Sequence, residues 1–292
     1  MARFEPGHTL HAERFLLVNP QLGTSRGGAP YLRCLLRNAD GQVAGRCWSF
    51  DASRLEGLQR DPVVEVDGEV VEFQGAPQVN IETIDAVRVD AATMRGLLPT
   101  APGDPVAMFR EVCGLLQGLT DPGLRALAEA ILDDEPLMQR FREAPAGVRK
   151  HHACIGGLMQ HTLQIMRIVD AVVATYKGDD VHLNRDLVML GAFLHDIGKT
   201  EELSWGGTFT YTRDGDLVGH IVRGAIMLEE KVAEAAMAGG EPLDGDLLLQ
   251  LQHLILSHHE RREYGAAKPP MTPEAHVLCM ADRLDATLHL VD

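Results

Sequence analysis

The sequence has no long apolar run, and this absence excludes several classes of protein. No stretch approaches the roughly 20 apolar residues that a helix needs to cross a bilayer. The first eight residues, Met1-Ala-Arg-Phe-Glu-Pro-Gly-His8, also do not resemble the apolar segment of a secretory signal. We therefore expect a cytoplasmic protein that makes no membrane contact.

Cysteine is scarce as well. The five cysteines are odd in number and widely spaced, and none belongs to a Cys-x-x-Cys pair. This pattern argues against both a disulfide framework and a zinc site built from thiolates. It predicts buried thiols instead.

Positive charge is also in short supply. The formal net charge of −15 argues against a broad nucleic-acid-binding surface, because affinity for the phosphate backbone comes from cations. The deficit is uneven, since residues 1–95 carry ten arginines, no lysine and 13 acids. Arginine suits phosphate recognition and base stacking, so a local binding face in this region remains open.

The chain is long enough for two domains, with 292 residues of which 45% are hydrophobic. In residues 1–95, short runs with period-two alternation predict strands at 15–18, 31–36, 43–48, 63–71 and 79–84. Asn38-Ala-Asp-Gly41 is a hairpin turn signal, and residues 51–60 leave room for a short helix. Five short strands in this length fit an OB-fold barrel. A small β-sandwich and an SH3-like barrel are the alternatives.

The predicted barrel also carries candidate nucleic-acid contacts. OB-folds bind single strands by stacking bases on aromatic rings and by holding phosphates with cations. The candidate contacts on the predicted second and third strands are Tyr31, Trp48, Arg33 and Arg46. Phe50 and Phe73 are further aromatic candidates. For each of these rings, a place in the barrel core is the alternative.

Residues 96–105 hold three prolines and two glycines, which predicts a linker. After it, the apolar period becomes that of helices. These are predicted at 106–119, 122–132, 136–142, 155–176, 187–196, 219–238, 243–257 and 273–290, with a small hairpin at 205–211. The predicted fold class is therefore multidomain: an all-β barrel followed by an all-α bundle over residues 106–292.

The segment Leu187–Lys199 places a histidine beside an aspartate at the end of an apolar helix that Gly198 is expected to terminate. Successive helical residues point about 100° apart, and a hydrolytic metal needs three or more protein ligands. His195 and Asp196 therefore need partners from elsewhere. Candidates in apolar helix patterns are His161, His220, His258, His259 and Asp282.

A lone histidine is usually a surface or core residue, but this set predicts a metal site within residues 151–290. Imidazole and carboxylate ligands without thiolate suit Mn, Fe, Co, Ni or Zn.

The order His, His-Asp, His, His-His, Asp resembles the HD-domain metal-dependent phosphohydrolases, and the five histidines resemble their two-metal branch. The resemblance implies in-line attack on phosphorus by a hydroxide that two divalent metals generate. It also implies a division of the ligands. One metal would take His161, His195, Asp196 and Asp282, and the other would share Asp196 with His220, His258 and His259.

Charged residues beside these ligands suggest further roles. Lys199, three residues after Asp196, is placed to contact a phosphate oxygen, and these two are the predicted catalytic residues. A solvated lysine is the alternative for Lys199. Arg223, one turn beyond His220, is a weaker candidate for substrate contact. Asp285 either orients a ligand from behind or lies on a helix surface.

Longer motifs carry a closer resemblance. The segments His151-His-Ala-Cys-Ile-Gly-Gly-Leu-Met-Gln-His161, Leu194-His-Asp-Ile-Gly-Lys199, Ser257-His-His-Glu260 and Ala281-Asp-Arg-Leu-Asp-Ala286 are similar to those of YhaM-type 3′-to-5′ exoribonucleases. In that family an OB-fold precedes an HD domain. The resemblance implies hydrolysis of single-stranded RNA, and to some degree single-stranded DNA, to nucleoside 5′-monophosphates with Mn²⁺ or Co²⁺. It also implies a substrate contact for His152.

Two other functions stay open. One is an HD phosphohydrolase of small nucleotides or cyclic dinucleotides, although no Gly-Tyr-Pro follows His258-His259 as the latter would require. The other is a non-catalytic protein that binds single strands and carries a structural metal. The sequence leaves the metal identity and the oligomeric state open, including a homo-oligomer.

Overall fold

The computed structural model describes residues 4–60, 62–148, 152–178, 180–206 and 208–289. His151 of the His-His motif lies outside the described residues. The chain separates into two compact units, one formed by Met1–Thr100 with Gly206–Thr208 and the other by Ala101–Trp205 with Phe209–Asp292. Each unit has its own apolar core.

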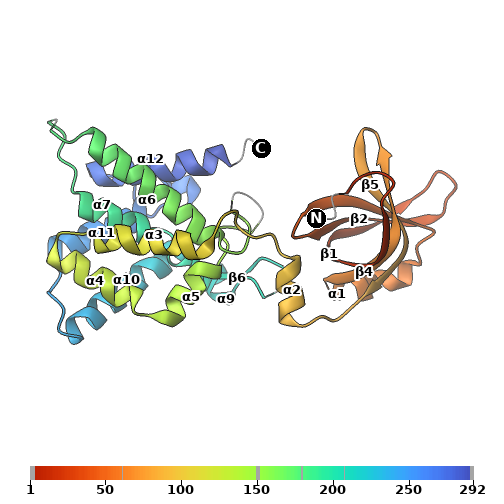
Figure 1. Ribbon diagram of the computed structural model, residues 1–292, viewed down its shortest axis with the longest axis horizontal. Helices are drawn as coiled ribbons and strands as arrows, with labels where there is room; N and C mark the ends of the chain where they lie inside the picture. The colour runs from red at the N-terminus through yellow and green to blue at the C-terminus, as the bar shows by residue number, and fades with distance from the viewer. Residues whose placement is uncertain (1–3, 61, 149–151, 179, 207, 290–292) are drawn as a thin grey trace. The chain divides into compact units, whose positions relative to one another are not determined.

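The first unit is a closed barrel of five strands (Figure 1). β1 (Thr9–Thr24), β2 (Pro30–Asn38), β3 (Gly41–Trp48), β4 (Val63–Phe73) and β5 (Ala76–Ala86) lie in the order β1-β2-β3-β5-β4, and β4 pairs with β1. β3 and β5 run parallel, and the other neighbours run antiparallel. This architecture confirms the predicted OB-fold barrel.

Three short helical segments accompany the strands. A 3₁₀ turn (Ala52–Arg54) and α1 (Leu55–Arg60) connect β3 to β4, where a short helix was predicted. α2 (Ala91–Leu97) follows β5, and its start is capped by the side chain of Asp90, which accepts a hydrogen bond from the Thr93 backbone. α2 was not predicted, because its seven residues are too few to show a helical period.

The barrel closes because β1 bends twice. Its register shifts near Ala12 and near Asn19, and both residues have positive φ, 49° and 50°. Bulges of this kind bend a strand and increase its twist. Residues 9–16 can therefore pair with β4, while residues 16–24 pair with β2. The predicted strand at 15–18 covers only the middle of this element.

Large apolar side chains from alternate strand positions fill the barrel, among them Phe15, Leu32, Leu36, Val66, Val79 and Ile84. Cys34 and Cys47 lie in the same core, and all five cysteines of the chain are free thiols. The prediction of buried thiols is correct for these two and for Cys279, whereas Cys113 and Cys154 are partly buried.

The second unit is built from helices. They are α3 (Pro105–Gln117), α4 (Pro122–Leu132), α5 (Glu135–Glu143), α6 (Gly157–Thr175), α7 (Arg185–Leu194), α8 (Lys199–Glu202), α9 (Arg213–Leu217), α10 (His220–Met237), α11 (Gly245–Ser257) and α12 (Pro273–Leu288), with a 3₁₀ turn at Arg262–Tyr264. The short strands β6 (Leu203–Ser204) and β7 (Thr210–Tyr211) pair near the predicted hairpin. In the part of the chain that the structure describes, no helix has both the length and the apolar character needed to cross a membrane.

Aspartate caps explain where the first helices of this unit begin. Asp104, Asp121 and Asp134 each accept a hydrogen bond from a backbone N–H in the first turn of α3, α4 and α5, respectively. Proline occupies the first turn of each helix, where its missing N–H is not needed. The predicted starts at residues 106, 122 and 136 agree to within one residue.

Helix α7 is the centre of the bundle. Its residues from Asp186 to Leu194 are all buried, because α6, α11 and α12 pack against it. The apolar helix predicted at 187–196 is thus buried on all of its faces. The predicted end at Gly198 was wrong: α7 ends at Leu194, with His195 as its C-cap. His195 and Asp196 consequently lie in the turn that leaves the helix.

Candidate metal centre

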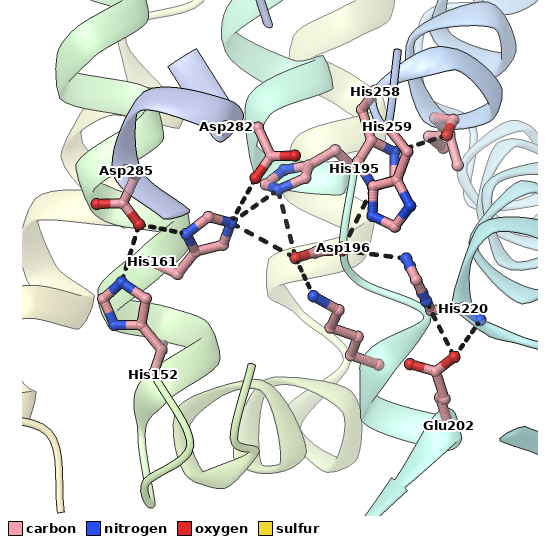
Figure 2. Close-up of polar contacts among 12 residues, drawn as sticks. His152, His161, His195, Asp196, Glu202, His220, His258, His259, Asp282 and Asp285 are labelled. Carbon is pink, nitrogen blue, oxygen red and sulfur yellow. Dashed lines mark hydrogen bonds and ion pairs between the residues drawn. The ribbon is translucent and has the colours of Figure 1, made fainter. Parts of the chain in front are cut away.

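Seven polar side chains meet in the helical unit (Figure 2). His161 comes from α6, His220 from the first turn of α10 and Asp282 from α12. The other four follow the C-terminal ends of α7 and α11, and they are His195, Asp196, His258 and His259. The structure thus brings together all seven side chains that the sequence proposed as metal ligands.

The carboxylate of Asp196 lies between two groups of histidines. Its Oδ2 is 3.5 Å from Nε2 of both His161 and His195. Its Oδ1 is 3.5 Å from Nε2 of His220 and 3.6 Å from Nε2 of His258. Each oxygen therefore faces a different group, which is the geometry that a bridging carboxylate needs.

The candidate ligand atoms fall into two sets, each with its members within 4.8 Å of one another. The first set contains His161, His195 and Asp282, and the second contains Asp196, His220, His258 and His259. We call them the His161 set and the His220 set.

The His220 set leaves buried atoms unsatisfied. Oδ1 of Asp196 and Nε2 of His220 and His258 are buried and have no hydrogen-bond partner within the described residues. Burying polar atoms without partners costs free energy. A cation is a partner that a carboxylate oxygen and imidazole nitrogens can share, and this donor set fits a divalent transition metal.

All five histidines turn Nε2 toward the centre because a partner holds Nδ1 from behind. Backbone carbonyls accept from three of them: Ala192 from His195 at 2.7 Å, Ile255 from His258 at 2.8 Å and Tyr264 from His259 at 2.8 Å. A proton on Nδ1 leaves Nε2 as the lone-pair donor that a metal requires.

Carboxylates hold the remaining two histidines, one in each set. Asp285 Oδ2 accepts from Nδ1 of His161 at 2.7 Å. Glu202 Oε1 accepts from both Nδ1 and the backbone N–H of His220, each at 3.0 Å. Asp285 is buried, so the structure supports its orienting role over the surface alternative. Glu202 was not among the predicted site residues, because its only signal in the sequence is its place as an acidic residue shortly after the His-Asp pair.

Gly198 determines how closely the turn after α7 approaches α10. A Cβ atom at this position would lie 2.1 Å from the carbonyl oxygen of His220 and 2.8 Å from the backbone nitrogen of Gly224. The two backbones are therefore in direct contact. Gly198 also caps α8, so one short segment carries Asp196, Lys199 and Glu202 to the site.

A buried ion pair lies at the edge of the centre. Lys199 Nζ is 2.6 Å from Asp196 Oδ2. Burial acts to raise the pKa of Asp196, but the charges of Lys199 and His195 hold it well below its usual range. Burial acts to lower the pKa of Lys199, but Asp196 raises it. Both groups are therefore charged at neutral pH.

The histidines differ in how readily they lose a proton. Burial lowers the pKa of His258 and of His259, so both are neutral and able to bind a metal at pH 7. Burial also acts on His161, but its hydrogen bonds to Asp282 and Asp285 raise its pKa to about 9. Metal binding at His161 therefore has to release a proton.

Two predicted substrate contacts of this unit have other partners. The His152 side chain is 1% exposed and contacts Asp285 and Gln160, which argues against the substrate contact that the resemblance implied. Arg223 donates to Asp214 through Nε at 2.9 Å and also through Nη2. It lines a cavity of about 390 Å³ that Glu201 and Lys231 also line. Its guanidinium is thus directed at Asp214 and not at a candidate ligand.

The four predicted barrel contacts lie together on the outer face of β2 and β3. Tyr31 is paired with Trp48, and Arg33 with Arg46, across the two strands. The rings of Tyr31 and Trp48 are 5.0 Å apart, and the Arg46 guanidinium carbon is 5.9 Å and 5.7 Å from their centroids. Trp48 is 48% exposed. We call these four residues the aromatic face.

Phe73 extends the aromatic face, because its ring centroid lies 4.9 Å from the Arg46 guanidinium carbon and its side chain is exposed. Phe50, in contrast, is buried in the barrel core. Gly23 pairs with Tyr31, and a Cβ there would lie 2.5 Å from the ring. The Tyr31 ring therefore lies directly over Gly23 of β1, and a larger residue at this position would displace the ring.

Comparison with known proteins gives matches over both units. The family model described as HD domain matches residues 158–287. The 3′-5′ exoribonuclease YhaM of Listeria monocytogenes serotype 4b is 31% identical over 99% of this chain and 88% of its own length. The proteins of the same name from Geobacillus sp. and Bacillus pumilus are 32% and 30% identical over 95% of this chain, and they are covered over 82% and 85% of their length.

A solved OB-fold domain of replication protein A from Methanococcus maripaludis is similar to 29% of this chain and is itself 86% covered, at 15% identity and a TM-score of 0.20. Because this score is low, the OB-fold assignment rests on the strand order of the barrel alone.

Proposed function

Because this chain belongs to the YhaM family of 3′-5′ exoribonucleases, we propose that it is a metal-dependent enzyme that degrades single-stranded RNA from the 3′ end. One observation carries the proposal beyond family membership. The carboxylate of Asp196 places one oxygen toward each of two histidine sets. A centre of this form suits phosphodiester hydrolysis with two divalent ions.

In this proposal His161, His195 and Asp282 would hold one ion, His220, His258 and His259 would hold the other, and Asp196 would be a ligand shared by the two. When bound, the pair supplies a water of lowered pKa and offsets negative charge on phosphoryl oxygens. Mn²⁺ and Co²⁺ are the ions that we propose first, and Fe, Ni and Zn also suit these ligands. Asp285 and Glu202 keep the two outer imidazoles directed at the centre.

Lys199 supplies positive charge beside the shared carboxylate, and we assign it a contact with a phosphate oxygen as charge develops there. Hydrolysis breaks the bond between phosphorus and the 3′ oxygen of the preceding nucleotide. The phosphate then stays on the 5′ carbon of the released nucleotide, and the shortened strand regains a 3′ hydroxyl. The products are nucleoside 5′-monophosphates.

The aromatic face supports a single strand as the substrate. Exposed rings stack on any base, and Arg33 and Arg46 offset phosphate charge. Such a face suits local binding in a chain whose net charge is −15. We propose residues 1–95 as the nucleic-acid-binding domain, 96–105 as the linker and 106–292 as the hydrolase. Single-stranded DNA is the second substrate, and we propose the cytoplasm as the place of action.

The test is a time course with Mn²⁺ on single-stranded RNA labelled at its 5′ end. The same strand blocked at its 3′ end and a panel of free nucleotides are run in parallel. We expect a ladder that shortens from the 3′ end and that both the block and a chelator abolish.

Intact RNA together with hydrolysis of a free nucleotide would favour a small-nucleotide phosphohydrolase. Binding of RNA with no hydrolysis of any substrate would favour the accessory-protein alternative. Either result would refute the exoribonuclease proposal.

A further inference from the structure

Behind the His161 set lies a second group of polar side chains, formed by His152, Asp285 and His289 (Figure 2 shows the first two). His152 Nε2 is 2.8 Å from Asp285 Oδ2, the same oxygen that accepts from Nδ1 of His161. The rings of His152 and His289 are 4.1 Å apart. None of these three side chains is a candidate ligand of the two histidine sets.

This group meets the spacing of a metal site, since its ligand atoms lie within 4.8 Å of one another. Its hydrogen bonding argues against that reading. Both ring nitrogens of His152 have partners, Asp285 at 2.8 Å and Gln160 at 3.1 Å. His289 Nδ1 contacts the Asp285 carbonyl oxygen at 3.0 Å. The His220 set, in contrast, has three unsatisfied buried atoms.

The backbone of His152 holds its ring in place. The residue has a φ of 53°, a left-handed conformation that non-glycine residues adopt at a cost. Its carbonyl oxygen accepts from the backbone N–H groups of Ala146, at 3.0 Å, and Cys154, at 2.9 Å. The strained conformation is therefore fixed by contacts on both sides of the residue, just before α6 begins.

We propose that His152 is a positioning residue for the His161 set. It holds the Asp285 carboxylate, and Asp285 in turn holds the His161 imidazole with Nε2 directed at Asp282 and His195. His152 thus acts on metal binding without touching metal or substrate. The inference rests on the proposed two-metal centre and assigns His152 a role different from substrate contact.

The consequence is specific to one half of the centre. His220 is held by Glu202, which the structure places on α8 and not in the His152 group. Loss of His152 should therefore lower the affinity for one of the two metal ions and leave the affinity for the other unchanged.

The experiment measures Mn²⁺ binding to the full-length protein by calorimetric titration, with electron paramagnetic resonance to count bound ions. His152→Asn keeps a residue that tolerates positive φ but is too short to reach Asp285 with a donor. His152→Gln places an amide donor near the position of Nε2 and is the rescue variant. The unfolding temperature of each variant is recorded as the control for folding.

We expect wild type to bind two ions. In His152→Asn one ion should keep its affinity and the other should bind about 10 to 100 times more weakly, as for other partners of metal-binding histidines. His152→Gln should recover most of the difference. The double variant His152→Asn/Asp285→Asn should bind metal about as weakly as Asp285→Asn alone. In the double variant His152→Asn/Glu202→Gln, the losses of binding free energy from the two single changes should add.

Three results would overturn the proposal. The first is an equal loss of affinity for both ions in His152→Asn, and the second is unchanged affinity in a folded His152→Asn variant. The third is a third ion that binds to wild type and not to His152→Asn. The measurement uses no RNA. A protein that binds two ions as expected but leaves RNA intact would refute the exoribonuclease proposal and support this one.

Discussion

The aromatic face exposes its side chains on β2 and β3 of the barrel, whereas the metal centre buries its side chains among helices of the second unit. The Trp48 ring contacts the tilted ring of Tyr31 and lies beside the Arg46 guanidinium. Asp196 is 2% exposed and surrounded by charged and polar atoms. An exposed ring can be removed with little effect on folding, while removal of a buried polar group disturbs the partners it leaves behind. The two regions should therefore respond differently to substitution.

The largest effect is expected at Asp196. Asp196→Asn keeps the size of the side chain but removes the charge that two ions would share. Hydrolysis of RNA should fall on the order of a thousandfold or more. Binding of a single strand, measured by fluorescence anisotropy, should stay close to that of wild type, because the aromatic face lies in the other unit. Activity within tenfold of wild type would contradict the bridging role.

A smaller effect is expected behind the centre. Glu202→Gln weakens the acceptor that holds His220, and metal affinity should fall about 10 to 100-fold. Glu201→Gln is the matched control, because Glu201 is more exposed and pairs with Arg140 instead. Metal titration of both variants tests the prediction. Similar losses in the two would show that general charge, and not orientation of His220, determines affinity.

The next effect is expected at Asp186, a buried carboxylate whose substitution should change the free energy of unfolding. Its Oδ2 accepts from the backbone of Thr120 and Asp121 and from the Thr120 hydroxyl, at 2.6 to 2.8 Å. Asp186→Asn should lower the free energy of unfolding by about 1.5 to 3 kcal/mol at pH 7. Asp170→Asn is the control, because Asp170 forms a partly exposed pair with Arg185 that contributes about 1 kcal/mol or less.

The Asp186 effect should also depend on pH. Burial acts to raise the pKa of Asp186, but these hydrogen bonds lower it below its ordinary value. A carboxylate with a lowered pKa contributes its stability above the pKa of the unfolded chain, about 3.9, and loses it as the pH falls through the folded value. The difference between wild type and Asp186→Asn should therefore shrink below pH 4. Denaturant unfolding at pH 7 and pH 3 measures it, and a constant difference would contradict the ionic origin.

The smallest change in the protein itself is expected at the aromatic face. Trp48→Ala should weaken RNA binding by about 1 to 3 kcal/mol, the contribution of one stacked base, and leave the unfolding temperature nearly unchanged. Phe50→Ala removes a ring from the barrel core only two residues away and should instead cost about 3 to 5 kcal/mol of stability. Equal loss of stability in both variants would erase the contrast between exposed and buried rings.

The barrel and the metal centre differed in what the sequence could predict. Period-two alternation located all five strands. The positions of His161, His195 and Asp282 in helical patterns predicted ligands that the structure brings together. Alternation did not reveal that Trp48 points outward while Phe50 points inward. The bends in β1 that decide how the barrel closes have no local pattern.

Partners behind the ligands were harder to predict than the ligands. His152 and Asp285 are separated by 133 residues, and their contact depends on how α12 packs against α6. Glu202 reaches His220 through the turn and short helix that follow α7. Such contacts depend on packing between elements, which spacing within one element does not encode.

The backbone contact at Gly198 has a consequence for the distance between Asp196 and His220, which belong to the same His220 set. Asp196 lies on one side of this contact and His220 on the other, so the gap between them is set by main-chain atoms that cannot change rotamer. A methyl group at Gly198 would push α10 away, and His220 would move with the helix, away from Asp196. The distance between Asp196 and His220 in the proposed catalytic centre therefore depends on how closely the two backbone segments pack, and less on the conformations of the side chains.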